Sequence, residues 1–349
     1  MVLLYKSDIW EVPKYNKFYE AILEYNDISY EKSNLNDTEF WDKVEEADYF
    51  IYRFVNTEYQ IQEAETIFPI IEDALGKNVF PNLRSRWHFD DKIKQYYLLK
   101  ELGFPVIDTH VFWNKKDAIK WVEGARYPVI FKLKSGAGSA NVAKIDNKRQ
   151  AHKVVARMFK EGINNGKIPL GNNLIFKSPV TFIKSLFYNL YTEKKYGVKK
   201  LFWKKHMNYV LFQKYLANNE YDIRVTIIGD RAYAFLRYNR DNDFRASGSG
   251  KLEYNQDKID KEAIKIAFNV SETCGFDSMA YDFLYDENNK LKICEISYTY
   301  LDEVLYDCPG IYDRDLNFEK GNFLPAFLHL KKLLDNKHLK HPDLDINEI

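Results

Sequence analysis

Two acidic residues in the C-terminal third of the chain have the type and spacing of a divalent-metal site. Asp282 and Glu295 each lie in a short apolar segment, and Asn288-Asn289 lies midway between them. A two-residue turn at these asparagines, which tolerate positive φ, would join the segments as a β-hairpin with Asp282 directly opposite Glu295. Two carboxylates so close repel each other unless a cation lies between them. Oxygen ligands on a rigid hairpin suit magnesium shared with phosphates, whereas two solvent-facing acids at a sheet edge are the alternative.

A lysine beside a glycine-containing loop has the chemistry of a polyphosphate site. Lys132 lies near the end of the apolar segment 127–133, and the loop 135–141 that follows contains Gly136, Gly138 and Ser139. The ammonium group would meet the negative charge while the small residues let backbone N–H groups approach. From the spacing alone, a hairpin turn with a surface lysine is an equally good interpretation.

A third group could hold a nucleoside. The apolar segment has backbone groups that could bind an adenine edge, and the acids after it could bind a ribose; an edge strand with a polar turn is the alternative. The residues are Gln213, Lys214, Tyr215 and Leu216, followed by Glu220 and Asp222.

Three arginines within nine positions form the fourth group. Arg237, Arg240 and Arg245 lie beside Asp241 and Asp243. Guanidinium groups so close suit a transferring phosphoryl group or a substrate carboxylate. A solvated loop with surface ion pairs is the competing interpretation.

The pattern of apolar residues predicts an α/β fold. Strands that alternate with helices near the N-terminus favour a parallel sheet covered by helices. We expect four units: an N-terminal α/β lobe (1–85), a lobe with the glycine loop (86–165), an insertion (166–207) and a lobe with the hairpin (208–349). The predicted strands are 2–5, 48–55, 106–112, 127–133, 142–145, 208–216, 222–228, 232–237, 279–285 and 290–297; the predicted helices are 14–25, 58–75, 90–102, a helix ending near 160, 257–274 and 321–334.

Composition limits the class of protein. The 349 residues contain 51 Lys plus Arg and 51 Asp plus Glu, so the formal charge of zero argues against a general nucleic-acid binder. No apolar run approaches the roughly 18–20 residues of a membrane span, and we expect no transmembrane segment. The three cysteines, Cys274, Cys294 and Cys308, form no C-x-x-C motif and indicate a reducing, cytoplasmic location.

The insertion differs from the rest of the chain. Between residues 167 and 206 it has nine lysines and one acid, Glu193, interleaved with aromatic residues. This composition favours a large acidic partner such as an acidic glycan precursor, with peripheral membrane contact through residues 182–205 as a further hypothesis. A solvated helical hairpin with aromatic packing is the commoner meaning of such a stretch.

Taken in order, the four groups resemble the ATP-grasp superfamily over roughly residues 90–309. The closest likeness is to the branch that contains ribosomal-protein glutamate ligase and glutathione synthetase-type enzymes. Asp91-Lys92 with Gly103-Phe104-Pro105 resembles the opening helix, where a lysine meets ATP phosphate. The branch's D-I-R, G-D and D-F-R signatures are matched by Asp222-Ile223-Arg224, Gly229-Asp230 and Asp243-Phe244-Arg245.

The resemblance implies a fold, a reaction and roles for these residues. Two grasp lobes would clasp ATP behind an N-terminal α/β lobe. The reaction would join a carboxylate to a small-molecule amine through an acylphosphate and form ADP; a phosphotransferase and an ATP-binding regulator are the alternatives. In the usual E-x-N metal motif this chain has Ser297 in place of Asn, and serine is a shorter and weaker ligand. For the nucleotide, the resemblance implies phosphate binding by Lys92 and Lys132, adenine binding by residues 213–216 and ribose binding by Asp222 or Glu220. It implies that Arg245, with Arg237 or Arg240, stabilises the transferring group. Magnesium would be bound by Asp282, Glu295 and Ser297.

Overall fold

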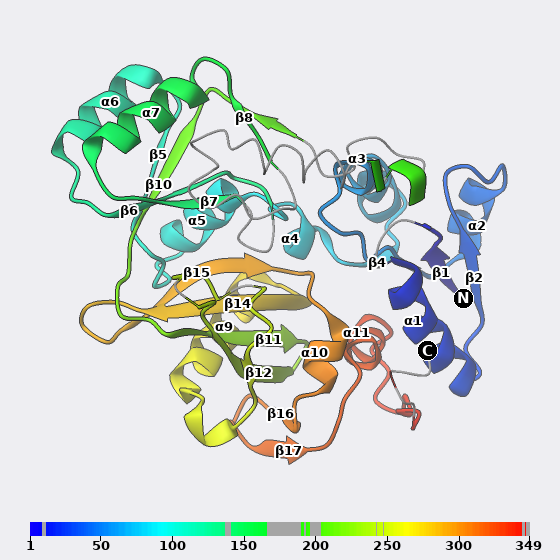
Figure 1. Cartoon of the computed structure of the whole chain (residues 1–349). Helices are drawn as coiled ribbons and strands as arrows, with labels where there is room; N and C mark the ends of the chain where they lie inside the picture. Colours follow the sequence, from blue (N-terminus) through cyan, green and yellow to red (C-terminus); the bar gives the residue numbers. More distant parts are fainter. Residues whose placement is uncertain are drawn as a thin grey trace.

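A computed structural model describes residues 1–8, 12–136, 141–165, 190–191, 193–195, 204–241, 243–246, 248–343 and 346. Within these ranges the chain forms an N-terminal lobe, an upper lobe (lobe A) and a lower lobe (lobe B) (Figure 1). The predicted α/β class is confirmed, because parallel and antiparallel sheets pack against helices throughout. No helix among the described residues is long and apolar enough to cross a membrane.

The N-terminal lobe is a parallel four-stranded sheet with the strand order β2-β1-β3-β4. The predicted first strand and first helix are confirmed. Strand β3 is shorter than the predicted 48–55, because the chain leaves the sheet after Ile51. The elements are β1 (Val2–Tyr5), α1 (Val12–Tyr25), β2 (Tyr30–Ser33), α2 (Phe40–Glu46), β3 (Tyr49–Ile51), α3 (Glu58–Phe68), the π-helical η1 (Pro69–Ala74), β4 (Asn78–Phe80) and α4 (Leu83–Arg86).

Lobe A is an antiparallel sheet with the order β5-β10-β6-β7, against which the helices α6 and α7 pack (Figure 1). Its second strand, β10, lies beyond the predicted boundary at 207/208, so the chain returns to lobe A after the insertion. The segment 208–216 was expected beside the strands of lobe B; the structure corrects this, since β10 pairs with β5 and β6. The elements are α5 (Lys92–Glu101), β5 (Thr109–Phe112), α6 (Lys115–Gly124), β6 (Val129–Lys132), β7 (Val142–Ile145), α7 (Lys148–Met158), β8 (Ile163–Asn164), β9 (Lys205–His206) and β10 (Val210–Lys214).

Lobe B is built on a seven-stranded sheet with the order β15-β14-β11-β12-β16-β17, in which β13 pairs with β12. The helix α9 packs on β11, β12 and β14, while α11 contacts both β11 and α1 of the N-terminal lobe. The predicted hairpin is confirmed, and the helices predicted over 257–274 and 321–334 form as α9 and α11, each beginning four residues later than predicted. The elements are β11 (Tyr221–Ile228), β12 (Arg231–Tyr238), β13 (Leu252–Glu253), the 3-10 turn η3 (Gln256–Lys258), α9 (Lys261–Cys274), β14 (Ser278–Tyr285), β15 (Leu291–Ser297), α10 (Asp302–Tyr306), β16 (Gly310–Tyr312), β17 (Phe318–Lys320) and α11 (Pro325–Leu333).

A buried histidine should make the fold sensitive to acid. His88 lies between the rings of Trp87 and Phe276, at centroid distances of 5.4 and 5.1 Å, and burial lowers its pKa to about 4. The unfolded chain binds a proton at His88 near its usual value of 6.5, so the free energy of unfolding should fall as the pH drops from about 6.5 to 4. Chemical denaturation of His88→Phe should show a flatter loss of stability across that window, and His338→Phe, an exposed control, should not. Parallel acid profiles for wild type and His88→Phe would contradict this assignment.

Candidate active site

A cavity of about 520 Å³ lies where the three lobes meet, which is within the size range of small-molecule sites. Most of the residues predicted from sequence line it. They are Lys92, Lys132, Gly136, Gln213, Lys214, Tyr215, Leu216, Asp222, Arg237, Arg245, Asp282, Glu295 and Ser297. Gly138 and Ser139 fall outside the described residues, and Glu220 and Arg240 do not belong to the lining.

The β14–β15 hairpin does place Asp282 opposite Glu295, as predicted, but through a different register. The tip is not the predicted two-residue turn: Asp286 N–H bonds to the Lys290 carbonyl, and Asn289 has a φ of 56°. The outer half of the hairpin is therefore displaced by one residue from the predicted pairing. A bulge at Cys294 lies between the pairs Phe283–Ile293 and Asp282–Glu295, and it brings the strands back to the predicted pairing.

The register of lobe B gathers charged side chains on the face that lines the cavity. Arg224 lies opposite Asp282 on the neighbouring strand, and Asp222 lies opposite Arg237. Arg224 binds both oxygens of Asp282, with Nη2 at 2.9 Å from Oδ2. Arg237 bridges the two acids, with Nη2 at 2.7 Å from Asp282 and Nε at 2.7 Å from Asp222. Alternation along the strands thus concentrates three ion pairs at one place.

These arginines correct the argument that repulsion must be relieved by a metal. Burial raises the pKa of Asp282, but the guanidinium groups of Arg224 and Arg237 together lower it by more and hold it below its usual range. Glu295 has its own protein cation, because Lys92 Nζ lies 3.0 Å from Glu295 Oε1. The two acids are therefore compensated separately by side chains of the protein.

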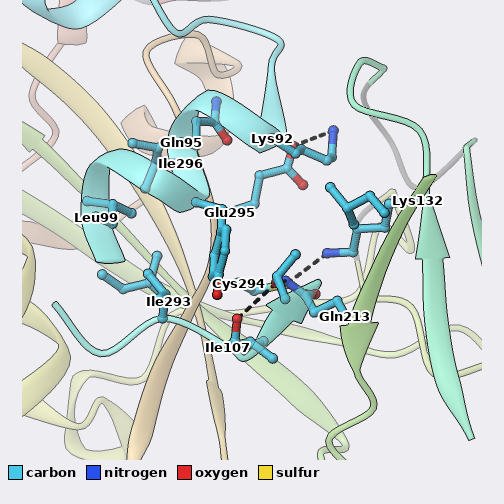
Figure 2. Close-up of a pocket in the computed structure, with 14 residues that line it drawn as sticks. Lys92, Gln95, Leu99, Ile107, Lys132, Gln213, Ile293, Cys294, Glu295 and Ile296 are labelled. Carbon is cyan, nitrogen blue, oxygen red and sulfur yellow. Dashed lines mark hydrogen bonds and ion pairs between the residues drawn. The ribbon is translucent and has the colours of Figure 1, made fainter. Parts of the chain in front are cut away.

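Two lysines of lobe A point toward strand β15, Lys92 at Glu295 and Lys132 at Cys294 (Figure 2). Lys92, the first residue of α5, also donates to the Gly136 carbonyl at 2.8 Å, and Lys132 Nζ lies 3.5 Å from Cys294 Sγ. Both lysines are buried. Burial lowers the pKa of Lys92, but the carboxylates of Glu295 and Asp90 outweigh it and raise the pKa above its usual value. Both ammonium groups are thus aimed at the region beside Glu295.

The start of the glycine loop is fixed by its neighbours. Gly136 has a φ of 104°, and a Cβ built on it would lie 1.9 Å from Asn141 Nδ2, so glycine is required there. The Gly136 N–H donates to Asp90 Oδ1 at 2.7 Å. Ser135 Oγ lies 2.9 Å from His206 Nε2, which ties the loop to the strand at the end of the insertion. Thus the positions of the loop's first residues depend on α5 and on β9.

The predicted nucleoside segment forms the opposite wall. Gln213 is buried and its Nε2 donates to Thr109 Oγ1 at 3.2 Å, while Lys214 pairs with Glu287 at 2.6 Å. The ring of Tyr215 lies 5.9 Å from that of Phe244, edge to face, so the loop after β12 reaches this segment. Of the two predicted ribose ligands, Glu220 is exposed and Asp222 is held by Arg237.

The three predicted arginines do not form one cluster. Arg237 belongs to the buried pairs described above, whereas Arg245 lines the cavity from the loop and binds Asp243, with Nη2 at 2.5 Å from Oδ2. Arg240 lies in the same loop, where its N–H donates to the Arg245 carbonyl. Ser297 lines the cavity, and its Oγ donates to the Thr299 carbonyl at 3.0 Å.

Three residues were not predicted to have a role at the site. Arg224 entered only as part of a family signature, and its pairing with Asp282 depends on two strands that are distant in sequence. Cys294 was used only as an indicator of a reducing location, but it lines the cavity at the bulge. Asp90 also lines it, and no sequence signal distinguishes it from its neighbour Asp91.

The residues present fit ATP with magnesium. Two lysines suit phosphates, and residues 215–216 offer backbone groups for adenine, because they follow the end of β10, whose own backbone pairs with β5 and β6. Among the described residues, no group of three or more His, Cys, Asp or Glu could hold a metal alone. Magnesium bound to nucleotide needs only one or two carboxylates besides phosphate oxygens, which Asp282 and Glu295 could supply.

Lys132→Ala should weaken ATP binding without unfolding the protein. A charged contact of this kind is worth about 1.5–3 kcal/mol, so the dissociation constant should rise roughly 10- to 100-fold in calorimetric titrations. Lys116→Ala, an exposed change on α6 of the same lobe, is the control. Unchanged affinity in folded Lys132→Ala would remove this lysine from the site.

The sequence of residues 184–301 matches the RimK-like ATP-grasp domain family. A curated relative, the uncharacterized protein MG012 of Mycoplasma genitalium, is 23% identical over 280 residues, covering 78% of this chain and 88% of that protein.

Solved structures show the same fold. An ATP-grasp RimK domain protein of Sphaerobacter thermophilus superposes with a TM-score of 0.55 at 11% identity, covering 96% of this chain and all of the other. N5-carboxyaminoimidazole synthetase of Staphylococcus aureus gives a TM-score of 0.57 at 13% identity, covering 95% of this chain and 76% of the other. Together with the match of residues 184–301 to that domain family, these likenesses show that the chain has the ATP-grasp fold.

Proposed function

We propose that this chain is an ATP-dependent carboxylate–amine ligase that forms ADP. The observation that carries the proposal is the convergence of two lysines of lobe A on strand β15 of lobe B, where Lys92 pairs with Glu295 and Lys132 lies against Cys294, in the cavity that Asp282 also lines. Paired cations opposite paired acids, in a cavity wide enough for a nucleotide, support phosphoryl transfer by positioning and charge neutralisation.

In the proposed reaction, the γ-phosphoryl group of ATP passes to a substrate carboxylate, and an amine then displaces phosphate from the acylphosphate. Lys92 and Lys132 neutralise the phosphate oxygens, and Arg245 lies on the lining where it can meet the substrate carboxylate. Asp282 and Glu295 would hold magnesium, which would withdraw charge from the phosphates. The buried position of both lysines limits the water around them, which protects a reactive acyl group from hydrolysis.

Trapping with hydroxylamine tests this proposal. The protein would be incubated with ATP, magnesium, hydroxylamine and a panel of carboxylates that includes amino acids, short peptides and uronic acids. A ligase should form a hydroxamate together with ADP and phosphate. A phosphotransferase would form ADP and a phosphorylated product without hydroxamate, and absence of ADP with every carboxylate would indicate a binding protein.

For the acceptor we propose an acidic molecule such as a glycan precursor, which the lysine-rich composition of residues 166–207 supports. Lys204 lies 3.1 Å from Glu58 of α3, so this lysine has a structural partner. Reversing Lys199 and Lys200 to Glu should therefore raise the KM for a polyanionic acceptor, with a smaller effect at high salt, and spare the KM for ATP. Lys204→Glu serves as the structural comparison. If neither the Lys199/Lys200 reversal nor ionic strength changed the KM for the acceptor, residues 166–207 would have a structural role instead.

A further inference from the structure

Among the described residues, Asp90 is the acid of the cavity that forms no ion pair, although the charge of Lys92, which is bound to Glu295, acts on it. Four carboxylates line it, all in the described part of the chain: Asp90, Asp222, Asp282 and Glu295. Asp222 and Asp282 are bound by arginines, and Glu295 is bound by Lys92. Asp90 instead accepts a hydrogen bond from a neutral group, the Gly136 N–H, at 2.7 Å.

The surroundings of Asp90 favour its protonated form. Burial raises its pKa to about 7, and the neighbouring charges of Glu295 and Asp91 act in the same direction. Lys92 and the Gly136 N–H act in the opposite direction and do not cancel the effect of burial. A carboxyl group that titrates near neutral pH can both take and release a proton in one catalytic cycle.

The backbone also holds Asp90 in an unusual conformation. Its φ is 51°, which few residues other than glycine, asparagine and aspartate adopt readily. This conformation directly precedes α5, so the same turn that starts the helix at Lys92 presents Asp90 beside the glycine loop. Asp90 and Lys92 thus face the start of the glycine loop from one turn.

We propose that Asp90 receives the attacking amine as an ammonium ion and removes its proton. This inference rests on the proposed ligase function. An unpaired carboxylate attracts a cation, and a substrate ammonium supplies it. The proton passes from nitrogen to an oxygen of Asp90, and the freed electron pair forms the C–N bond to the acyl carbon. The bond from that carbon to the phosphate oxygen breaks, and the departing phosphate takes that electron pair and the second nitrogen proton.

The inference predicts that Asp90 matters for a protonated nucleophile and not for a neutral one. Ammonium chloride and hydroxylamine are the two probes, since ammonium is charged at pH 7 and hydroxylamine is largely neutral. Asp90→Asn keeps the backbone conformation and an acceptor oxygen for Gly136 but cannot accept a proton. With the carboxylate found by trapping, amide formation from ammonium should fall by about 10²- to 10⁴-fold in Asp90→Asn, while hydroxamate formation and ATP affinity stay near those of wild type.

The pH profile gives a second measurement. In wild type the rate with ammonium should decline below pH 7 more steeply than the rate with hydroxylamine, and Asp90→Asn should lose this difference. Carbon-13 NMR of aspartate carboxyls, with Asp90→Asn for assignment, should show a group that titrates near pH 7. Asp277→Asn is the matched control, because burial also raises the pKa of Asp277 but it lines a different cavity.

The outcomes are distinct. No hydroxamate from wild type would remove the proposed function and this inference with it. Hydroxamate without any amide from ammonium in wild type, or equal losses of both products in Asp90→Asn, would overturn the inference and leave the ligase intact. A structural defect in Asp90→Asn would lower both products and ATP affinity together, so it would also count against a proton-accepting role.

Discussion

Asp282→Asn should lower turnover by about two to three orders of magnitude, the range seen when one preorganised charge is removed from a transition state. It should also reduce the gain in ATP affinity that magnesium provides, because the neutral amide is a poorer ligand than the carboxylate. Calorimetric ATP titrations with and without magnesium measure this gain without knowledge of the other substrates. Asp230→Asn, an exposed change at the β11–β12 turn, is the control.

The same variant tests what compensates Asp282. If two carboxylates repelled each other across the hairpin, removing one charge would stabilise the protein. The ion pairs with Arg224 and Arg237 predict the opposite, since the change leaves two partly or wholly buried guanidinium groups without a full charge partner. Chemical denaturation should therefore show a less stable Asp282→Asn; a gain in stability would mean that these ion pairs contribute little.

Arg53→Met should be the most destabilising single change described here, at about 3–5 kcal/mol. Arg53 follows β3 of the N-terminal lobe and pairs with Asp302 of α10 at 2.7 Å, and both side chains are fully buried. The Arg53 guanidinium also lies 3.8 Å from the centroid of the Tyr15 ring. Without Arg53, Asp302 would remain as an uncompensated buried charge where two lobes join.

A double-mutant cycle separates the pair from the packing around it. Arg53→Met/Asp302→Leu should recover a large part of the loss, because apolar residues can replace a buried ion pair at little cost. Lys265→Met, which breaks the exposed pair with Glu262, should change the free energy of unfolding by less than about 0.5 kcal/mol. If the double variant were as unstable as Arg53→Met, loss of packing would explain the effect.

Local patterns predicted the elements better than their partners. The hairpin and the helix α9 followed from apolar spacing and turn residues, both of which act over a few positions. Strand β10 was expected beside β11, which follows it in sequence, yet it pairs with β5 and β6. A short apolar strand such as β10 can pair with several neighbours, and only the completed sheets decide among them.

The site shows the same limit. The pairing of Asp282 with Glu295 was reached by a count that assumed the wrong turn and overlooked the bulge at Cys294; the two errors cancelled. The role of Arg224 could not be predicted, because it depends on β11 lying beside β14. Asp90 lines the cavity, whereas Asp91 caps helix α5 and pairs with Lys134, and this difference exists only in the assembled structure.

The bulge at Cys294 has a mechanical consequence for the joint between the lobes. Next to it, Ile293 exchanges two backbone hydrogen bonds with the chain entering lobe A: its N–H donates to the Pro105 carbonyl at 2.7 Å, and its carbonyl accepts from Ile107 N–H at 3.2 Å. Glu295 is only two residues further along (Figure 2). A rotation of lobe A that keeps both bonds would carry Lys132 around a stationary Glu295, with Ile293 as the pivot. Closure of the lobes would therefore change the direction from which Lys132 faces Glu295 more than it would change the distance between the two charges.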